Sequence, residues 1–344
     1  MARTLPGADV LSTWDYNLLE LGDACWEEGL MKSIGKLLFT HYGLIEYFNL
    51  SEERLSCFLS SLDSLYRKSN PYHSAAHAVD VAINVHFLLQ SGFLRFFTKM
   101  DLLVLCVAAL GHDAGHFALN NAFLVNSDHE IVRKYGAVSA LEHFHVSKLM
   151  EVLEDENSFV HALSPSDLVE LKTMVTKMVL ATDMSRHRDY FTQFEEWCNV
   201  ARKESGVTQG DNDRSWVEAR IPNLSPAERT LFMSMVVKCA DLANVVKPVE
   251  QAEAWAERIM REFQAQGERE LALALPLTQP AKTANFEWQL AKHQLGFLEN
   301  VVGPLYQSMM ELADEESRSI VLNHAKRNAE IWSKRVHDLD PERN

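Results

Sequence analysis

Four short clusters of histidine and aspartate constrain this chain more than any other feature of its 344 residues. Each cluster lies beside or at the end of a strongly apolar, helix-like stretch. The four segments are His73-Ser-Ala-Ala-His77, His112-Asp113-Ala-Gly-His116, Thr182-Asp183 and Asp241-Leu-Ala-Asn244. Burying a polar group without a partner costs roughly 2–7 kcal/mol. Imidazole and carboxylate groups are ligands of divalent metals, and one metal site would pair them together. We therefore expect the fold to assemble the clusters into one site.

The apolar residues recur with helical periodicity along nearly the whole chain, and strand-like alternation is almost absent. Ser225-Pro226-Ala-Glu228 combines an N-cap serine, a proline at the first helical position and a glutamate at the third. We expect an all-α fold with long polar connections at about 203–224 and 267–284. The expected helices cover roughly 30–48, 51–68, 75–92, 98–112, 137–150, 165–181, 186–202, 226–240, 248–267, 285–307 and 312–336.

The chain carries a formal charge of -15, from 33 Lys and Arg against 48 Asp and Glu. A negative field repels polyanions, so nucleic acid and anionic membrane surfaces are not expected as partners. A small anionic substrate requires a local reversal of sign, which bound divalent cations supply. The composition therefore favours a small-molecule ligand, and it leaves the oligomeric state undetermined.

The cysteines and apolar runs indicate the compartment. The five cysteines are scattered and form no Cys-x-x-Cys motif, which favours a reducing, cytoplasmic location over a disulfide framework. The apolar run from Leu102 to Gly111 has about half the length of a membrane span. We expect it to form a buried helix, with no direct membrane contact from this segment.

The spacing within the clusters suits a metal site. His73 and His77 are four residues apart, which places both rings on one helix face. His112 and Asp113 end a buried apolar helix, and Asp241 ends another. A single buried histidine is more often a core residue than a ligand. Four such clusters in one chain favour a site.

The chain has no motif for a nucleophilic serine and none for a glycine-rich loop that binds phosphate through its backbone. The chain lacks a Gly-x-Ser-x-Gly elbow, and no two of its glycines stand at Gly-x-Gly spacing. A phosphate here would be held by metal and side chains, and hydrolysis would use a water activated by metal.

Six blocks taken in order resemble the catalytic domain of the class I cyclic nucleotide phosphodiesterases, over about residues 30–335. They are Tyr72-His73-x-x-x-His77-Ala78-x-Asp80-Val81, His112-Asp113-x-x-His116, Leu141-Glu142, Thr182-Asp183-Met184, Ala240-Asp241-Leu242-x-Asn244 and Gln294-x-Gly296-Phe297. The resemblance implies a single catalytic domain over 1–344, part of a longer protein, with the HD-type phosphodiesterase fold and a metal site at the base of a deep pocket. Departures at Ser74, Gly115 to Phe117, and Phe144 resemble the kinetoplastid type C branch.

The same resemblance implies two metal ions. His77, His112, Asp113 and Asp241 would hold Zn²⁺, and Asp113 would also reach a second ion, Mg²⁺ or Mn²⁺. The waters of this second ion would be held by His116, Glu142, Thr182 and Asp183.

The resemblance also assigns catalysis and substrate binding. His73 would protonate the leaving oxygen, with Glu262 holding its imidazole cationic and oriented. The substrate would be cyclic AMP, with cyclic GMP as the second candidate. The nucleotide would be bound by Tyr72, Met184, Asn244, Ile259, Phe263, Gln294 and Phe297.

Without the resemblance, the residues leave plainer interpretations open. Ile259, Phe263 and Phe297 could be ordinary core, and Glu262 could be a solvated charge. Two other classes of function also compete with the phosphodiesterase. The chain could be another HD-type nucleotide phosphohydrolase, although no basic cluster for a polyphosphate stands near His112 or Asp241. It could also be a non-catalytic cyclic nucleotide sensor or helical scaffold.

Overall fold

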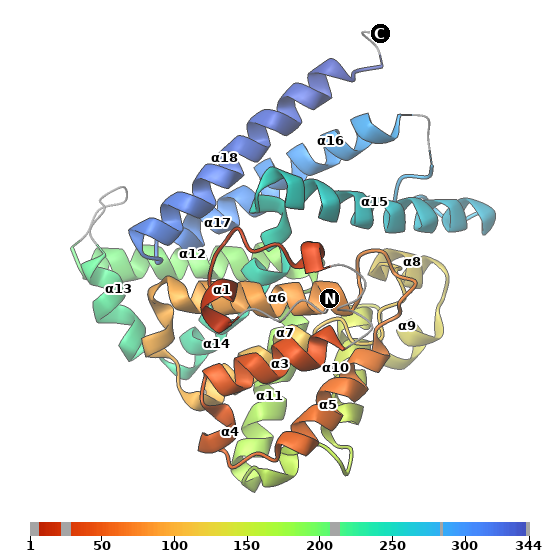
Figure 1. The fold of residues 1–344 in the computed structure, drawn as a ribbon. Coiled ribbons are helices and arrows are strands. Elements are labelled where there is room, and N and C mark those ends of the chain that lie inside the picture. The colour runs from red at the N-terminus through yellow and green to blue at the C-terminus, as the bar shows by residue number, and fades with distance from the viewer. Residues whose placement is uncertain (1–6, 22–28, 207–213, 283–284, 342–344) are drawn as a thin grey trace.

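The computed structural model describes residues 7–21, 29–206, 214–282 and 285–341, and the regular structure in these ranges is entirely helical (Figure 1). This confirms the all-α expectation. The longer helices are α3 (Leu30–His41), α5 (Glu52–Leu65), α6 (Ala75–Leu88), α7 (Lys99–Gly111), α10 (Ala140–Leu153), α11 (Pro165–Ala181), α12 (His187–Glu204), α14 (Pro226–Asp241), α15 (Val249–Ala272), α16 (Phe286–Phe297), α17 (Gly303–Met310) and α18 (Glu315–Asp338). The shorter ones are α1 (Ala8–Leu11), α4 (Leu44–Tyr47), α8 (Asn121–Asn126), α9 (Glu130–Tyr135) and α13 (Ser215–Arg220).

The centre of the molecule is formed by α6 and α7. Every residue from Ala76 to Leu88 and from Asp101 to Gly111 is buried. A helix that is apolar on all sides has no face for water and must be surrounded by other helices. Helices α3, α11 and α14 supply this cover. The apolar run from Leu102 to Gly111 is therefore a buried helix, as expected.

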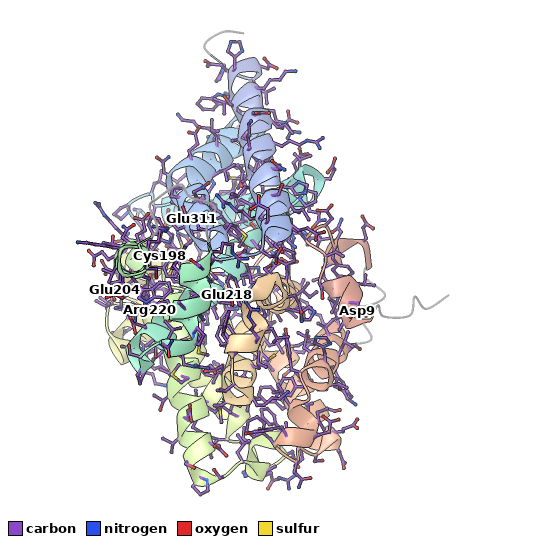
Figure 2. The ribbon with its side chains drawn as sticks, turned by 90° about the vertical axis from the view of Figure 1, so that its left-hand side faces the viewer. Asp9, Cys198, Glu204, Glu218, Arg220 and Glu311 are labelled. Carbon is purple, nitrogen blue, oxygen red and sulfur yellow. The ribbon has the colours of Figure 1, made fainter. Side chains whose placement is uncertain are left out.

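Helices α15, α16 and α18 lie together at one end of the molecule, above α6 and α14 in the view of Figure 1. On the adjoining side, Figure 2 shows α12 end-on with Cys198 on it, and Glu204 at the end of α12 close to Arg220 at the end of α13. Arg220 Nη2 lies 2.6 Å from Glu228 Oε1 in the first turn of α14. This ion pair ties α13 to the start of a central helix.

The largest differences from the expected helices have local causes. The expected helix over 285–307 is interrupted by a π-helical turn, η8 (Leu298–Val302), just before Gly303 and Pro304. Pro304 has no backbone N–H to continue the ladder, and a Cβ at Gly303 would lie 2.7 Å from the carbonyl oxygen of Leu298.

The two expected loops contain more helix than the sequence indicated. Helix α15 runs on to Ala272, and α13 with the 3₁₀ turn η6 (Ile221–Asn223) occupies part of 203–224. Residues 207–213 of that connection lie outside the described residues. Helices α8 and α9 were missed because six residues give too few turns to show a period.

The structure describes four of the five cysteines, together with the apolar helices noted in the sequence. Cys57, Cys106, Cys198 and Cys239 are unpaired, and Cys25 lies outside the described residues. Among the described helices, none combines the length and apolar character that a membrane crossing requires.

The start of α14 gives the first prediction. Ser225 accepts a hydrogen bond from the Glu228 N–H, and Glu228 accepts one from the Ser225 N–H. Replacing an N-cap serine by alanine costs about 1 kcal/mol. Ser225→Ala is expected to lower the free energy of unfolding, measured by urea denaturation, by about that amount. The exposed Ser60 within α5 is the matched control, and Ser60→Ala should leave the free energy within about 0.5 kcal/mol.

Candidate metal centre and adjoining pocket

The clusters meet at a pocket of about 430 Å³. Its floor is formed by the ends of α7 and α14 and its walls by α10, α15 and α16. His77 and His112 do not line it, because they are buried behind Asp113 and Asp241. The residues singled out from the sequence that line it are Tyr72, His73, Asp113, His116, Glu142, Thr182, Asp183, Met184, Asp241, Asn244, Ile259, Glu262, Phe263, Gln294 and Phe297.

Two of these lining residues, Asp113 and Asp241, meet the buried His77 and His112, and we define these four residues as the metal corner. His77 Nε2 lies 3.0 Å from Asp241 Oδ1 and 3.8 Å from Asp113 Oδ2. His112 Nε2 lies 3.3 Å from each of the same two oxygens. A tetrahedral ion with bonds of 2.0–2.2 Å separates its ligand atoms by roughly 3.3–3.6 Å. The two nitrogens and two oxygens therefore fit a small divalent ion.

Hydrogen bonding within the metal corner also fits a cation. His112 Nδ1 donates to the carbonyl oxygen of Ala109 at 2.9 Å, one turn earlier in α7, which directs Nε2 at the corner. That buried Nε2 has no hydrogen-bond partner among the described residues. A cation between this nitrogen and the two carboxylates would give each of them a partner.

The imidazole and carboxylate groups of the metal corner stabilise one another's charged forms. Burial alone would lower the pKa of His112, but the carboxylates of Asp113 and Asp241 outweigh it and raise this pKa well above its usual value. Burial would raise the pKa of both aspartates, and the charge of His112 instead holds each well below its usual range. The corner thus binds positive charge strongly.

A second group of possible ligands consists of Asp113, His116 and His145. His145 was missed as a site residue, although it follows Glu142 by three residues and so shares its face of α10. His145 Nδ1 donates to the Ala114 carbonyl oxygen at 2.9 Å, and its Nε2 lies 3.8 Å from Asp113 Oδ1. His116 Nδ1 accepts from the Ala118 N–H, so a neutral ring there carries its proton on Nε2 and can donate to a water.

The acidic side of the pocket is formed by Glu142 and Asp183. Asn121 Nδ2 donates to Glu142 Oε2 at 3.0 Å, and Ser139 Oγ donates to Asp183 Oδ2 at 2.6 Å. Burial, then the charge of Asp183, raises the pKa of Glu142 to about 7. Thr182 is buried beside them, and its hydroxyl donates to the Val179 carbonyl oxygen. Acidic and hydroxyl groups in this arrangement can accept hydrogen bonds from the waters of a cation.

His73 is oriented by Glu262, which is 3% exposed and therefore not the solvated charge considered above. His73 Nδ1 lies 2.5 Å from Glu262 Oε2, and Glu262 Oε1 accepts the backbone N–H groups of Tyr72 and His73. Burial would lower the pKa of His73, but the charge and hydrogen bond of Glu262 outweigh it and raise that pKa. The ring also stacks on His116, with centroids 3.9 Å apart. Glu262 thus favours the protonated form of His73, and among the described residues Nε2 has no hydrogen-bond partner.

The apolar part of the pocket lies between α15 and α16. Ile259 and Phe263 come from α15, and Gln294 and Phe297 from α16. The aromatic side chains serve the core as well, because Phe263 and Phe297 both pack against it. A planar ring can be enclosed between these two helices.

At the rim, Asn244 Nδ2 donates to the Tyr72 hydroxyl at 2.5 Å, and Met184 is 40% exposed. Gln279, in the segment 271–284 that the family resemblance places in the pocket wall, also lines the pocket. The lining residues Asn120, Gln266 and His293 had no sequence signal of their own.

The fold and the site together define an all-α protein with a histidine–aspartate metal corner beneath a half-apolar pocket. The sequence model described as 3'5'-cyclic nucleotide phosphodiesterase matches residues 72–324, well over half of the chain. The chain therefore belongs to this family, as the resemblance of its motifs implied. Its assignment to the kinetoplastid branch stays a prediction.

Relatives and solved structures agree with the family. The mouse (Mus musculus) high affinity cAMP-specific and IBMX-insensitive 3',5'-cyclic phosphodiesterase 8A is 27% identical over 335 residues, 95% of this chain and 40% of the relative. The human (Homo sapiens) dual specificity calcium/calmodulin-dependent 3',5'-cyclic nucleotide phosphodiesterase 1B is 30% identical over 322 residues, 90% of this chain and 55% of the relative. The chain thus spans about half the length of these relatives.

The phosphodiesterase domain of the RhoPDE fusion protein from the choanoflagellate Salpingoeca rosetta has the same fold. It superposes with a TM-score of 0.81 at 27% identity, covering 95% of this chain and 96% of that one.

The metal corner gives the second prediction. Asp241→Ala removes an anionic ligand that bonds His77, so bound divalent metal after dialysis, measured by mass spectrometry, should fall by at least about tenfold. The exposed Glu196→Ala is the control for loss of a carboxylate and should keep the wild-type metal content. Circular dichroism should show unchanged helix content in both. Equal metal content in Asp241→Ala and wild type would contradict the metal corner.

Proposed function

We propose that this chain hydrolyses 3',5'-cyclic nucleotides to 5'-nucleoside monophosphates and so ends a second-messenger signal. The observation that carries the proposal is the position of the His73–Glu262 pair beside the metal corner, at one pocket, in a chain of this family. The metal corner lies where a phosphate would be held, and the pair lies where a leaving oxygen would need a proton.

We further propose Zn²⁺ at the metal corner and Mg²⁺ or Mn²⁺ beside Asp113. The nitrogen-rich donor set suits zinc, and the carboxylates with their hydrogen-bonded neighbours suit a hydrated hard cation. When bound, such ions polarise the phosphate and supply an ionised water near neutral pH. His116, His145, Glu142, Thr182 and Asp183 would orient the waters around the second ion.

In this proposal His73 acts as the general acid. Its Nδ1 is committed to Glu262, so its Nε2 carries the proton that reaches the O3' oxygen as the phosphorus–O3' bond breaks. An alkoxide is a poor leaving group at neutral pH, and protonation during bond cleavage removes that barrier. Glu262 keeps the imidazole charged until the transfer, and its two backbone hydrogen bonds prevent the ring from turning.

The pocket is proposed to hold the purine between Phe297 on one side and Ile259 and Phe263 on the other, with the Gln294 amide on its edge. A glutamine amide can accept from the adenine amino group, or present its donor to guanine O6. We favour cyclic AMP as the substrate, with cyclic GMP as the second. One named relative is described as cAMP-specific and another as dual specificity.

The competing phosphohydrolase requires cations for a polyphosphate. Among the described residues that line the pocket there is no lysine or arginine. This observation favours a substrate with a single phosphate charge.

A cytoplasmic, reducing location for the protein is supported by the four unpaired cysteines.

The substrate test is a side-by-side comparison. Wild-type protein with zinc and magnesium is expected to hydrolyse cyclic AMP, with a higher kcat/KM than for cyclic GMP, and to lose activity with a chelator. Gln294→Ala should raise KM for both nucleotides about tenfold, because a lost hydrogen bond costs roughly 1–1.5 kcal/mol. The exposed Gln193→Ala should leave KM unchanged. Turnover of cyclic GMP alone would reverse the substrate preference, and turnover of neither would refute the function.

The general acid has its own test. His73→Ala should lower kcat by roughly 10²–10⁴-fold, the usual contribution of a positioned acid, while bound zinc is retained. Near wild-type turnover would remove His73 from the mechanism. Loss of zinc together with activity would make it a ligand instead.

A further inference from the structure

One wall of the pocket is assembled from three segments. Asn120 comes from the start of α8, Gln266 from α15, and Gln279 from the connection that follows α15. Of the metal corner and the His73–Glu262 pair, only Glu262 lies on one of these segments, one helical turn before Gln266 on α15. Something must hold three separate pieces of chain in one wall.

The group that joins them is Glu270, which is fully buried on α15. Its Oε2 accepts the backbone N–H groups of Thr278 at 2.8 Å and Gln279 at 3.2 Å. Its Oε1 accepts Gln266 Nε2 at 2.9 Å and the Thr278 hydroxyl at 2.5 Å. All four hydrogen bonds of this one carboxylate go to residues of the wall or to their neighbour.

Two further contacts complete the assembly. Gln266 Oε1 accepts the Asn120 N–H at 2.8 Å, so the amide fixed by Glu270 also fixes the start of α8. A Cβ at Gly267 would lie 2.7 Å from the Gln279 carbonyl oxygen, so only glycine lets the connection approach α15 this closely. The three segments of the wall are therefore held in close contact by hydrogen bonds and by the small size of Gly267.

A buried carboxylate is a costly way to gain stability alone, since apolar residues of similar size often stabilise as well or better. What a carboxylate provides is four acceptor positions with defined directions. Burial would raise the pKa of Glu270, but the hydrogen bonds from Thr278, Gln266 and Gln279 hold it below its usual value, so the group is an anion at neutral pH. The four directed hydrogen bonds of Glu270 therefore suit a role in holding the segments of the pocket wall in place.

We propose that Glu270 is a positioning residue for nucleotide binding: by holding Gln266 and the Thr278–Gln279 backbone against α15, it sets the shape of the pocket wall. The inference rests on the proposed function. Because Glu270 contacts neither the metal corner nor His73 through any hydrogen bond given above, it acts on binding of the nucleotide and leaves the chemical step alone. Its removal should raise KM and leave kcat.

The test compares Glu270→Gln with Glu268→Gln, an exposed glutamate two residues earlier on the same helix. Glutamine keeps the size of the side chain but turns an NH2 group toward donors. For Glu270→Gln we expect KM for cyclic AMP to rise about tenfold or more, the effect of losing one charge-assisted hydrogen bond. We expect kcat to stay within about twofold of the wild-type value. The bound metal and the pH at which activity falls on the alkaline side should also equal those of wild type. Glu268→Gln should match wild type throughout.

Two additional measurements keep the inference falsifiable. Thr278→Val removes only the hydroxyl donor, and it should raise KM in the same direction if Glu270→Gln proves unable to fold. Binding of cyclic AMP to chelator-treated protein, measured by calorimetry, should weaken by the same factor as KM rises. This measurement tests the wall even if wild type shows no turnover, the result that would refute the function itself. Unchanged affinity in both variants, or a fall in kcat at constant KM, would overturn the inference.

Discussion

The site depends on two carboxylates and two imidazoles being held at the ends of helices that water cannot reach. Helices α6 and α7 are buried along nearly their whole length, so their polar ends face the interior. His77, His112, Asp113 and Asp241 are the groups left there, and their nitrogens and oxygens lie 3.0–3.8 Å apart. Unpaired, such groups would oppose folding. The divalent ion proposed for the metal corner would pair all four groups together.

Helix α15 connects this centre to the rest of the pocket. Within one helix, Glu262 orients His73, Ile259 and Phe263 form an apolar wall, and Glu270 organises the opposite connection. Acid, apolar face and wall therefore move as one rigid body. A helix provides this because its rise and turn fix every side chain relative to the others.

Much of the site could be predicted because metal chemistry is encoded in short segments. The His73–His77 spacing and the adjacent His112-Asp113 pair are local patterns, and their residue types are few. His145 was missed because neither it nor His143, the other histidine of α10, belongs to such a pattern. Only its contacts with the Ala114 carbonyl oxygen and Asp113 show where its side chain points. The burial of Glu262 could not be predicted either, since nothing in the sequence distinguishes one buried glutamate on a charged helix from the exposed ones.

The sequence by itself determined the all-α class, the buried central helices and the start of α14, because periodicity and capping act over a few residues. Its short histidine and aspartate motifs also indicated which residues would meet at one site, while their role as metal ligands stays a prediction. Tertiary structure alone decided which helix ends meet, that α15 continues to Ala272, and that Glu270 joins Asn120, Gln266 and Gln279 into one wall. These features depend on packing between segments about 150 residues apart, from Asn120 to Glu270. Close approach at Gly267 and hydrogen bonds across chain segments exist only once the helices have packed.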